Sequence, residues 1–417
     1  MGANVNTDQT TRTVDVENPG PPGAASSGGQ AGSNDPGLRG VDLSTGWVVT
    51  AQQSVIYDVR LKDGLFDVHH RDLLEIGSAR RAKRLRRFVV VDEAVDAIYG
   101  DRIRRYFAAH DVETHILTVG SSETKKTMES VLAVVDGIDA FGISRRHEPI
   151  IAVGGGVLLD IVGLAASLYR RSTPYIRVPT TLVGIIDAGI GAKTGVNYSS
   201  SKNRLGSYFP PKVVFLDRTF LASLEPRQLS NGLAEILKIA LVKDLRLFEL
   251  LEEHGERLIE DRFQDNTAAE EVLERAIHCM LEELQSNLWE EHLERLVDFG
   301  HTFSPLLEMR ALPSLLHGEA VNIDMALSTA LSVGRGLVSP AEGDRILSTM
   351  RALRLPTWHQ LCQPELLWDA LQEVVAHRDG LQRMPLPVGI GVATFFNDLQ
   401  RSEIDEAVDL LAAGGFR

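Results

Sequence analysis

Short apolar runs rich in β-branched residues alternate with longer amphipathic stretches from Trp47 to Asp217. This alternation predicts a parallel α/β layer, in which a covering helix follows each strand. Helical periodicity is clearest in Glu93–Ala109 and Glu123–Phe141. The expected strands are Val55–Leu61, Phe88–Val91, His115–Val119, Ile150–Val153, Tyr175–Val178 and Val213–Leu216. We therefore predict a Rossmann-like parallel sheet that binds its ligand at the carboxyl ends of its strands.

The pattern changes after Asp217, where Leu, Glu and Ala dominate and apolar positions recur with a helical period. The helical stretches are 227–262, 267–292, 317–335 and 340–353. We predict an α/β domain over 41–217 and a mostly α-helical domain over 218–417, with the active site in the cleft between them. Residues 1–40 hold eight Gly, four Pro and no aromatic residue, so we expect a flexible tail there.

Composition and net charge argue against several classes of protein. The 417 residues include 43 Lys and Arg against 57 Asp and Glu, a net charge of −14 that disfavours binding to nucleic acid. The two cysteines form no CxxC pair, so a thiolate zinc cage is excluded and a reducing cytoplasm is expected. No apolar run approaches the ~18 residues of a membrane span, and no signal-peptide pattern opens the chain. We expect a soluble protein without a membrane partner.

A glycine triplet, Gly154-Gly155-Gly156, joins an expected buried strand to an expected helix that contains Asp160. Glycines allow close backbone approach, and the unpaired N–H groups of a helix N-terminus suit the pyrophosphate of a dinucleotide. The run is not GxGxxG, because Leu159 stands at the sixth position. A turn without a ligand, with Asp160 as an ordinary N-terminal helix acid, is the alternative.

The segment 178–206 combines threonines, an aspartate, glycines and lysines, and is too polar for a core and too glycine-rich for a long helix. Such segments commonly build sites. Lys193, Lys202 and Asn203 are spaced as donors for anionic oxygens, with solvated surface lysines as the alternative.

Three residues of the second half suggest a metal site: Glu235 in GLAEILK, His301 in DFGHTF and His317 in LLHGEAV. One carboxylate and two imidazoles form the ligand set of an open catalytic site for Zn²⁺ or Co²⁺. An accidental trio among twelve histidines is the alternative. Lys238 lies three positions after Glu235 on the same helix face, either in the site or in a surface ion pair.

The ordered motifs GGGVLLD, VPTTLVGIIDAGIGAKTGVN, SKN, GLAEILK, DFGHTF and LHGEAV resemble the sugar phosphate cyclases, of which dehydroquinate synthase is the best known. The resemblance extends from about residue 55 to 395. It implies a dehydroquinate synthase-like fold, a homodimer, and a phosphate-eliminating lyase that uses NAD and one divalent metal, Zn or Co. The α/β domain would bind NAD, and the helical domain would bind the metal and the substrate.

The resemblance also implies roles for individual residues. The cofactor-binding residues would be Asp92, Glu123, Lys126, Gly154, Gly155, Gly156, Asp160, Thr180, Thr181, Asp187, Lys193 and Lys202. The metal ligands would be Glu235, His301 and His317. The substrate-facing or catalytic residues would be Asp187, Lys193, Lys202, Asn203 and Lys238, with Arg171 at the phosphate and with Asp298 and His377 at positions where the chain departs from dehydroquinate synthase.

These departures carry a substrate argument. Pro305 replaces a histidine of dehydroquinate synthase, Asp298 replaces an asparagine, and His377 lies in a segment that is lysine-bearing there. An arginine and a lysine fall on Glu294 and Met280, and a substrate carboxylate buried without cationic partners would be costly. The substrate is therefore expected to lack a carboxylate. A one-residue slip of the alignment, however, would restore the arginine as Arg295.

The resemblance is strongest to the branch that cyclises sedoheptulose 7-phosphate to 2-epi-5-epi-valiolone for C7-cyclitol antibiotic biosynthesis. That reaction implies transient oxidation by NAD, phosphate elimination, reduction and intramolecular aldol closure. The alternatives are dehydroquinate synthase, another sedoheptulose 7-phosphate cyclase, 2-deoxy-scyllo-inosose synthase, a metal alcohol dehydrogenase resembling glycerol dehydrogenase, and a non-catalytic binding protein that kept the fold.

Overall fold

A computed structural model describes residues 51, 53–77, 84–199, 201–265 and 267–415, and the expected tail over 1–40 lies outside these residues. From Val55 onward the chain forms one compact unit, which contains both the α/β part and the helical part. Across the described ranges, no helix combines the length and the apolar character needed to cross a lipid bilayer.

Six parallel strands form the sheet in the order β1-β8-β5-β4-β2-β3. Their bounds are β1 Asp58–Leu61, β2 Arg86–Asp92, β3 Glu113–Val119, β4 Ile150–Gly154, β5 Tyr175–Pro179 and β8 Val213–Leu216. Each corresponds to one of the six strands expected from the sequence, which confirms the predicted parallel α/β layer. The pattern is clearest in β4, β5 and β8, which are buried throughout and, except for Arg177 in β5, apolar.

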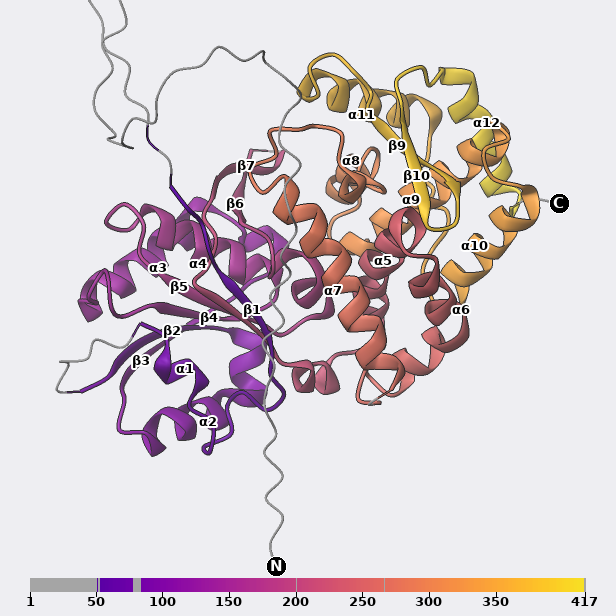
Figure 1. Cartoon of the computed structure of the whole chain (residues 1–417). Helices are drawn as coiled ribbons and strands as arrows, with labels where there is room; N and C mark the ends of the chain where they lie inside the picture. Colours follow the sequence, from indigo (N-terminus) through magenta and orange to yellow (C-terminus); the bar gives the residue numbers. More distant parts are fainter. Residues whose placement is uncertain (1–50, 52, 78–83, 200, 266, 416–417) are drawn as a thin grey trace, which may run out of the picture. The chain divides into compact units, whose positions relative to one another are not determined.

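Successive side chains of β2 point to opposite faces of the sheet, and each face has its own helices. Phe88 and Val90 pack with α3 (Met128–Phe141) and α4 (Gly156–Leu168). Val89 and Val91 pack with α1 (Asp72–Glu75) and α2 (Glu93–Ala109) on the other face. Figure 1 shows the two helix layers above and below the sheet. The expected helix over 123–141 is a short 3₁₀ turn, Glu123–Lys125, followed by α3.

The polar segment 178–206 contains structure that the sequence analysis did not predict. A π-helical turn, Gly184–Ala188, leads into the antiparallel hairpin of β6 (Lys193–Tyr198) and β7 (Ser201–Tyr208). The hairpin stands apart from the six-stranded sheet as a two-stranded sheet of its own.

The second half is mostly helical, as predicted. Its helices are α5 Pro226–Lys243, α6 Leu245–Glu260, α7 Ala268–Ser286, α8 Ser304–Ala311, α9 His317–Gly334, α10 Pro340–Ala352, α11 Pro364–His377 and α12 Arg401–Ala412. The stretch 227–262 is two helices, and the stretch 267–292 ends its helix at Ser286. A hairpin of β9 (Met384–Gly389) and β10 (Val392–Phe396) was not expected. The proposed boundary at 217/218 stays a prediction.

A buried arginine in the middle of β5 shapes the loop that carries candidate site residues. Arg177 is fully buried, and its guanidinium donates to four backbone carbonyls of the π-turn and the approach to β6. The acceptors are Ala188 O at 3.2 Å, Gly189 O at 3.2 Å, Gly191 O at 2.5 Å and Lys193 O at 2.9 Å. Tyr57 adds a hydroxyl bond to Ile190 O at 2.8 Å. Arg177 therefore joins the sheet to the loop between Asp187 and Lys193.

Replacing this guanidinium should destabilise the chain. Arg177→Met leaves four loop carbonyls without their charged donor, so we expect the free energy of unfolding to fall by about 3 kcal/mol or more. Urea denaturation followed by circular dichroism measures the change. Arg177→Lys keeps the charge but reaches fewer carbonyls and should give an intermediate loss. Equal stability of wild type and the methionine variant would contradict this role for Arg177.

Candidate active site

One acid and two imidazoles from separate segments of the helical part converge at a single point. Glu235 lies in the middle of α5, His301 follows the 3₁₀ turn Leu296–Asp298, and His317 is the first residue of α9. One ligand atom of each side chain lies within 4.8 Å of those of the other two. The two imidazole centroids are 5.5 Å apart. The structure therefore brings together the trio expected to bind a metal.

The Glu235 carboxylate fits a cation because its charge is buried and faces two imidazoles. The residue is 0% exposed. Lys238 Nζ lies 2.5 Å from Oε2, and His317 Nε2 lies 3.3 Å from Oε1. Burial alone would raise the pKa of Glu235, but Lys238 and the two imidazoles hold it well below its usual range. A carboxylate and two imidazole nitrogens suit Zn²⁺ or Co²⁺.

Both histidines are oriented through Nδ1. His301 Nδ1 lies 3.1 Å from Phe299 O, and His317 Nδ1 lies 2.9 Å from Glu308 Oε2. Each oxygen accepts a hydrogen bond from Nδ1–H and so directs Nε2 to the shared point, as the second partners of metal-binding histidines do. Burial lowers the pKa of His301 to about 4, and the nearby Lys238 charge acts in the same direction.

His317 differs from His301 in its charge environment. Burial and Lys202 lower its pKa, but Glu308 and Glu235 outweigh them and raise it to about 9. The second proton of a charged His317 sits on Nε2, which faces Glu235. A cation bound at this point would take the place of that proton, because metal ligation requires the neutral imidazole.

The hairpin reaches this cluster through Lys202 of β7. Its ammonium donates to Glu308 Oε1 at 2.6 Å and Oε2 at 2.8 Å, and it lies 3.5 Å from His317 Nδ1. Burial raises the pKa of Glu308, but His317 and Lys202 hold it far below its usual range. Sequence analysis missed Glu308, because one acid on a short helix gives no periodic or motif signal.

Lys238 is part of this cluster and not of a surface ion pair, because only 1% of it is exposed. Burial lowers the pKa of Lys238, but the carboxylates of Glu235 and Asp187 outweigh burial and raise it. Asp187 lies in the π-turn whose loop Arg177 holds. The structure therefore places one permanent cation beside the acid of the trio.

The glycine triplet ends β4 and begins α4, as expected. Gly155 is the N-cap of α4, so no side chain occupies the first N–H groups of the helix. A Cβ on Gly155 would lie 3.1 Å from Thr181 Cγ2, and one on Gly156 would lie 3.0 Å from Ala188 Cβ. These distances leave little room for a side chain at either position. The geometry suits an anionic group at the helix N-terminus.

The other residues expected at the cofactor surround this turn. Lys126 is buried, and its ammonium contacts Asp160 Oδ2 and Asn203 Oδ1, both at 2.6 Å. Glu123 Oε1 accepts from Asn197 Nδ2 at 2.8 Å, so both members of the Glu123 and Lys126 pair face the hairpin.

Asp92 and the two threonines lie at the carboxyl ends of β2 and β5. Asp92 caps α2 by accepting from Ala94 N at 2.8 Å, and it also accepts from the Ser121 hydroxyl. Thr180 N donates to Gly154 O at 3.0 Å, and Thr181 Oγ1 accepts from Gly184 N at 3.1 Å. Both carboxylate oxygens of Asp92 thus already accept hydrogen bonds within the protein.

Two expected residues do not reach the cluster. Arg171 is exposed beyond the end of α4 and before β5, at the sheet edge opposite the strand carboxyl ends, so this chain does not bring it to the trio. His377 is exposed at the end of α11, whereas the adjacent Arg378 is buried and contacts Asp298 Oδ2 at 3.2 Å. Sequence analysis missed Arg378. The roles of Arg171 and His377 stay predictions.

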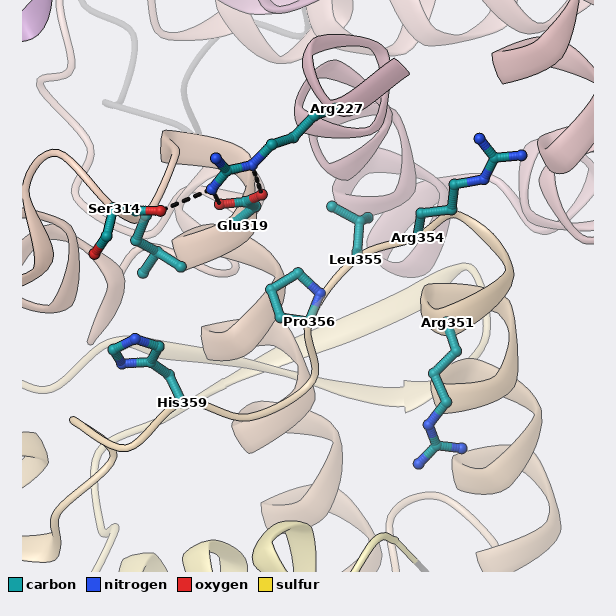
Figure 2. Close-up of a pocket in the computed structure, with 9 residues that line it drawn as sticks. Arg227, Ser314, Glu319, Arg351, Arg354, Leu355, Pro356 and His359 are labelled. Atoms are coloured by element: carbon teal, nitrogen blue, oxygen red, sulfur yellow. Dashed lines mark hydrogen bonds and ion pairs between the residues drawn. The ribbon is translucent and has the colours of Figure 1, made fainter. Parts of the chain in front are cut away.

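A separate pocket lies beside the N-terminus of α9 (Figure 2). Arg227 pairs with both oxygens of Glu319, at 2.6 and 2.7 Å, and donates to Ser314 O at 2.7 Å. Glu319 also accepts from Leu316 N at 2.8 Å. Figure 2 shows Arg351 and Arg354 pointing away from this pair. The Arg227 charge is already matched, and the contact holds the first turn of α9, where His317 lies.

Comparison with known proteins gives a consistent family. Models of the 3-dehydroquinate synthase N-terminal and C-terminal domains match residues 116–231 and 232–377. A 2-epi-5-epi-valiolone synthase of Actinomyces sp. is 57% identical over 374 residues, 88% of this chain and 98% of that protein. A demethyl-4-deoxygadusol synthase of Trichormus variabilis is 38% identical over 371 residues, 87% of this chain and 89% of that protein.

A solved structure adds a comparison of the whole fold. The 2-epi-5-epi-valiolone synthase ValA of Streptomyces hygroscopicus subsp. jinggangensis, with NAD⁺ and Zn²⁺ bound, superposes with a TM-score of 0.84. The two sequences are 55% identical, and the match covers 88% of this chain and 99% of that one. The predicted resemblance and fold class are therefore confirmed.

Loss of the carboxylate that orients His317 should weaken cation binding at the trio. Glu308→Gln removes the charged partner of Nδ1, so we expect the affinity for Zn²⁺ to fall roughly tenfold to a hundredfold. Competition with a chelating dye measures it. Glu252→Gln, which removes a carboxylate from an exposed pair with Arg345, is the matched control and should keep wild-type affinity. Unchanged Zn²⁺ affinity in Glu308→Gln would rule out this orienting role.

Proposed function

The chain belongs to the 3-dehydroquinate synthase family, and on that premise we propose that it is a 2-epi-5-epi-valiolone synthase. It converts sedoheptulose 7-phosphate to the cyclitol and inorganic phosphate. The observation that carries the proposal is the fully buried Glu235 carboxylate, which faces two imidazoles and Lys238. The identity to named 2-epi-5-epi-valiolone synthases supports the same reading.

The cofactors of the solved relative fit the residues of this chain. NAD would bind with its pyrophosphate at the N-terminus of α4, and a divalent cation would bind to Glu235, His301 and His317. When bound, NAD accepts and returns a hydride, and the cation polarises the oxygens of the alcohol and carbonyl groups. The substrate thus undergoes oxidation, phosphate elimination, reduction and aldol closure without net consumption of NAD.

The side chains of the protein supply binding and charge. Lys238 is buried and charged beside Glu235, so it donates to substrate oxygens that develop negative charge near the trio. Lys193 has a 60% exposed side chain, and its ammonium pairs with Glu290, so it remains accessible to a substrate oxygen. Lys202 donates to both oxygens of Glu308, which holds its positive charge next to His317.

Position and protection from water are the remaining contributions of the protein. Arg177 holds the loop from Ala188 to Lys193, so the polar groups on either side of it keep a fixed geometry. The trio lies at the edge of a core in which α5 is almost completely buried. Charged groups act more strongly in such a low-dielectric environment than they do in water.

Turnover distinguishes this reaction from its rivals. Incubation with sedoheptulose 7-phosphate, NAD and Zn²⁺ or Co²⁺ should release phosphate, while absorbance at the NADH band stays flat at steady state. Glu235→Gln is the control and should release none. Stoichiometric NADH would indicate an alcohol dehydrogenase, and turnover of the carboxylated heptulosonate 7-phosphate instead would indicate a dehydroquinate synthase. NMR of the product then assigns its stereochemistry.

We also propose the homodimer and the cytoplasmic location that the sequence led us to expect. Light scattering of the purified chain tests the first. A mass of one chain at micromolar concentration would exclude the dimer.

A further inference from the structure

Asp298 is a buried carboxylate held between two arginines. Arg295 contacts it through Nη2 at 2.5 Å and Nε at 3.1 Å, and Arg378 contacts it through Nη2 at 3.2 Å. Arg378 comes from the end of α11, 80 positions further along the chain. Burial raises the pKa of Asp298, but the two guanidiniums outweigh burial and lower it, so the carboxylate is ionised.

This arginine pair lies next to the segment that carries His301. Asp298 precedes His301 by three residues, and its carbonyl accepts from His301 N at 3.0 Å. Glu290 contacts both Arg295 and Lys193, so the pair is also joined to the start of the β6–β7 hairpin.

The charges of this group are nearly matched by the protein itself. Glu290 contacts both Arg295 and Lys193. Arg378 uses its other nitrogen, Nη1, on the carbonyls of Gln382 at 3.0 Å and Arg383 at 3.1 Å. Three cations, Lys193, Arg295 and Arg378, thus share two carboxylates, and Lys193 is the most exposed of the three. The group as a whole carries one positive charge in excess, but both guanidiniums already have acceptors within the protein.

The position of Arg295 gives a different reason for expecting a substrate without a carboxylate. The alignment at Glu294 suggested that the cation is absent, but Glu294 is exposed and Arg295 lies against Asp298. The cations that a carboxylate needs are therefore present and already occupied.

We infer that Asp298 determines substrate specificity by acting as an internal carboxylate that occupies the Arg295–Arg378 pair. This inference rests on the proposed function, because it concerns which polar groups the same sugar substrate carries. A substrate carboxylate entering here would meet the like charge of Asp298 and find both guanidiniums already bonded to protein acceptors. A neutral hydroxymethyl end meets no such penalty. Removing the charge of Asp298 while keeping its shape exposes two guanidiniums to a ligand carboxylate.

The test is the affinity of Asp298→Asn for the carboxylated heptulosonate 7-phosphate, measured by isothermal titration calorimetry on the Zn²⁺- and NAD-loaded protein. We expect binding at least about tenfold tighter than in wild type, as a new charge-assisted hydrogen bond would give. Asp398→Asn, which removes an exposed carboxylate from a pair with Arg335, is the matched control and should leave the affinity unchanged.

Two further variants separate specificity from folding. Asp298→Glu keeps the charge and should keep the discrimination of wild type. Arg295→Gln combined with Asp298→Asn restores the charge balance and should lose the gain. Thermal unfolding and NAD affinity of each variant report whether the site is intact. If an intact Asp298→Asn protein shows no gain, or if the double variant gains equally, the inference is overturned.

The outcomes also separate this inference from the proposed function. Wild-type protein that turns over sedoheptulose 7-phosphate, with no gain in the variant, refutes the internal carboxylate alone. Wild-type protein that fails to turn over this sugar refutes the proposed function, and a gain in Asp298→Asn would still stand as an anion site created by removing one charge.

Discussion

The burial of the Glu235 carboxylate is the constraint on which the candidate site depends. An ionised carboxylate taken out of water costs several kcal/mol unless cations or donors replace the water. In α5 the neighbouring positions are apolar, so the compensation comes from Lys238 on the same helix and from imidazoles of two other segments. The helical part must therefore fold with α9 and the turn before α8 against α5, and that packing creates the cluster.

The β6–β7 hairpin joins this cluster to the glycine turn. Lys202 contacts Glu308 and His317, whereas the next residue, Asn203, accepts from Lys126, which also pairs with Asp160. Asn203 lies at φ 52° in the irregular part of the hairpin, and the two consecutive residues contact the two halves of the site. Lys193 at the start of the hairpin reaches Glu290 after α7. A small two-stranded element thus connects the sheet, α8 and the loop after α7.

The elements that sequence reasoning predicted are those with a uniform environment. The four inner strands β2, β4, β5 and β8 are mostly buried and largely apolar, and α5, α6, α7, α9 and α10 follow a helical period. Both hairpins were missed for physical reasons. Most residues of β7 face solvent, and β9 contains two prolines, which usually argue against a strand. Motifs located the glycine turn and the trio, but Glu308, Arg177 and Arg378 belong to no motif.

The sequence alone determined which donor types are available, their order along the chain, and the resemblance that links them to one family. Only the tertiary structure decided which of two adjacent residues pairs with Asp298. Arg295 and not Glu294, and Arg378 and not His377, turn inward to Asp298. Neighbouring residues at a turn or a helix end project in different directions, and the partner that selects between them lies up to 80 positions away. Pairing of buried charges depends on distances of a few ångströms, which spacing along the chain does not encode.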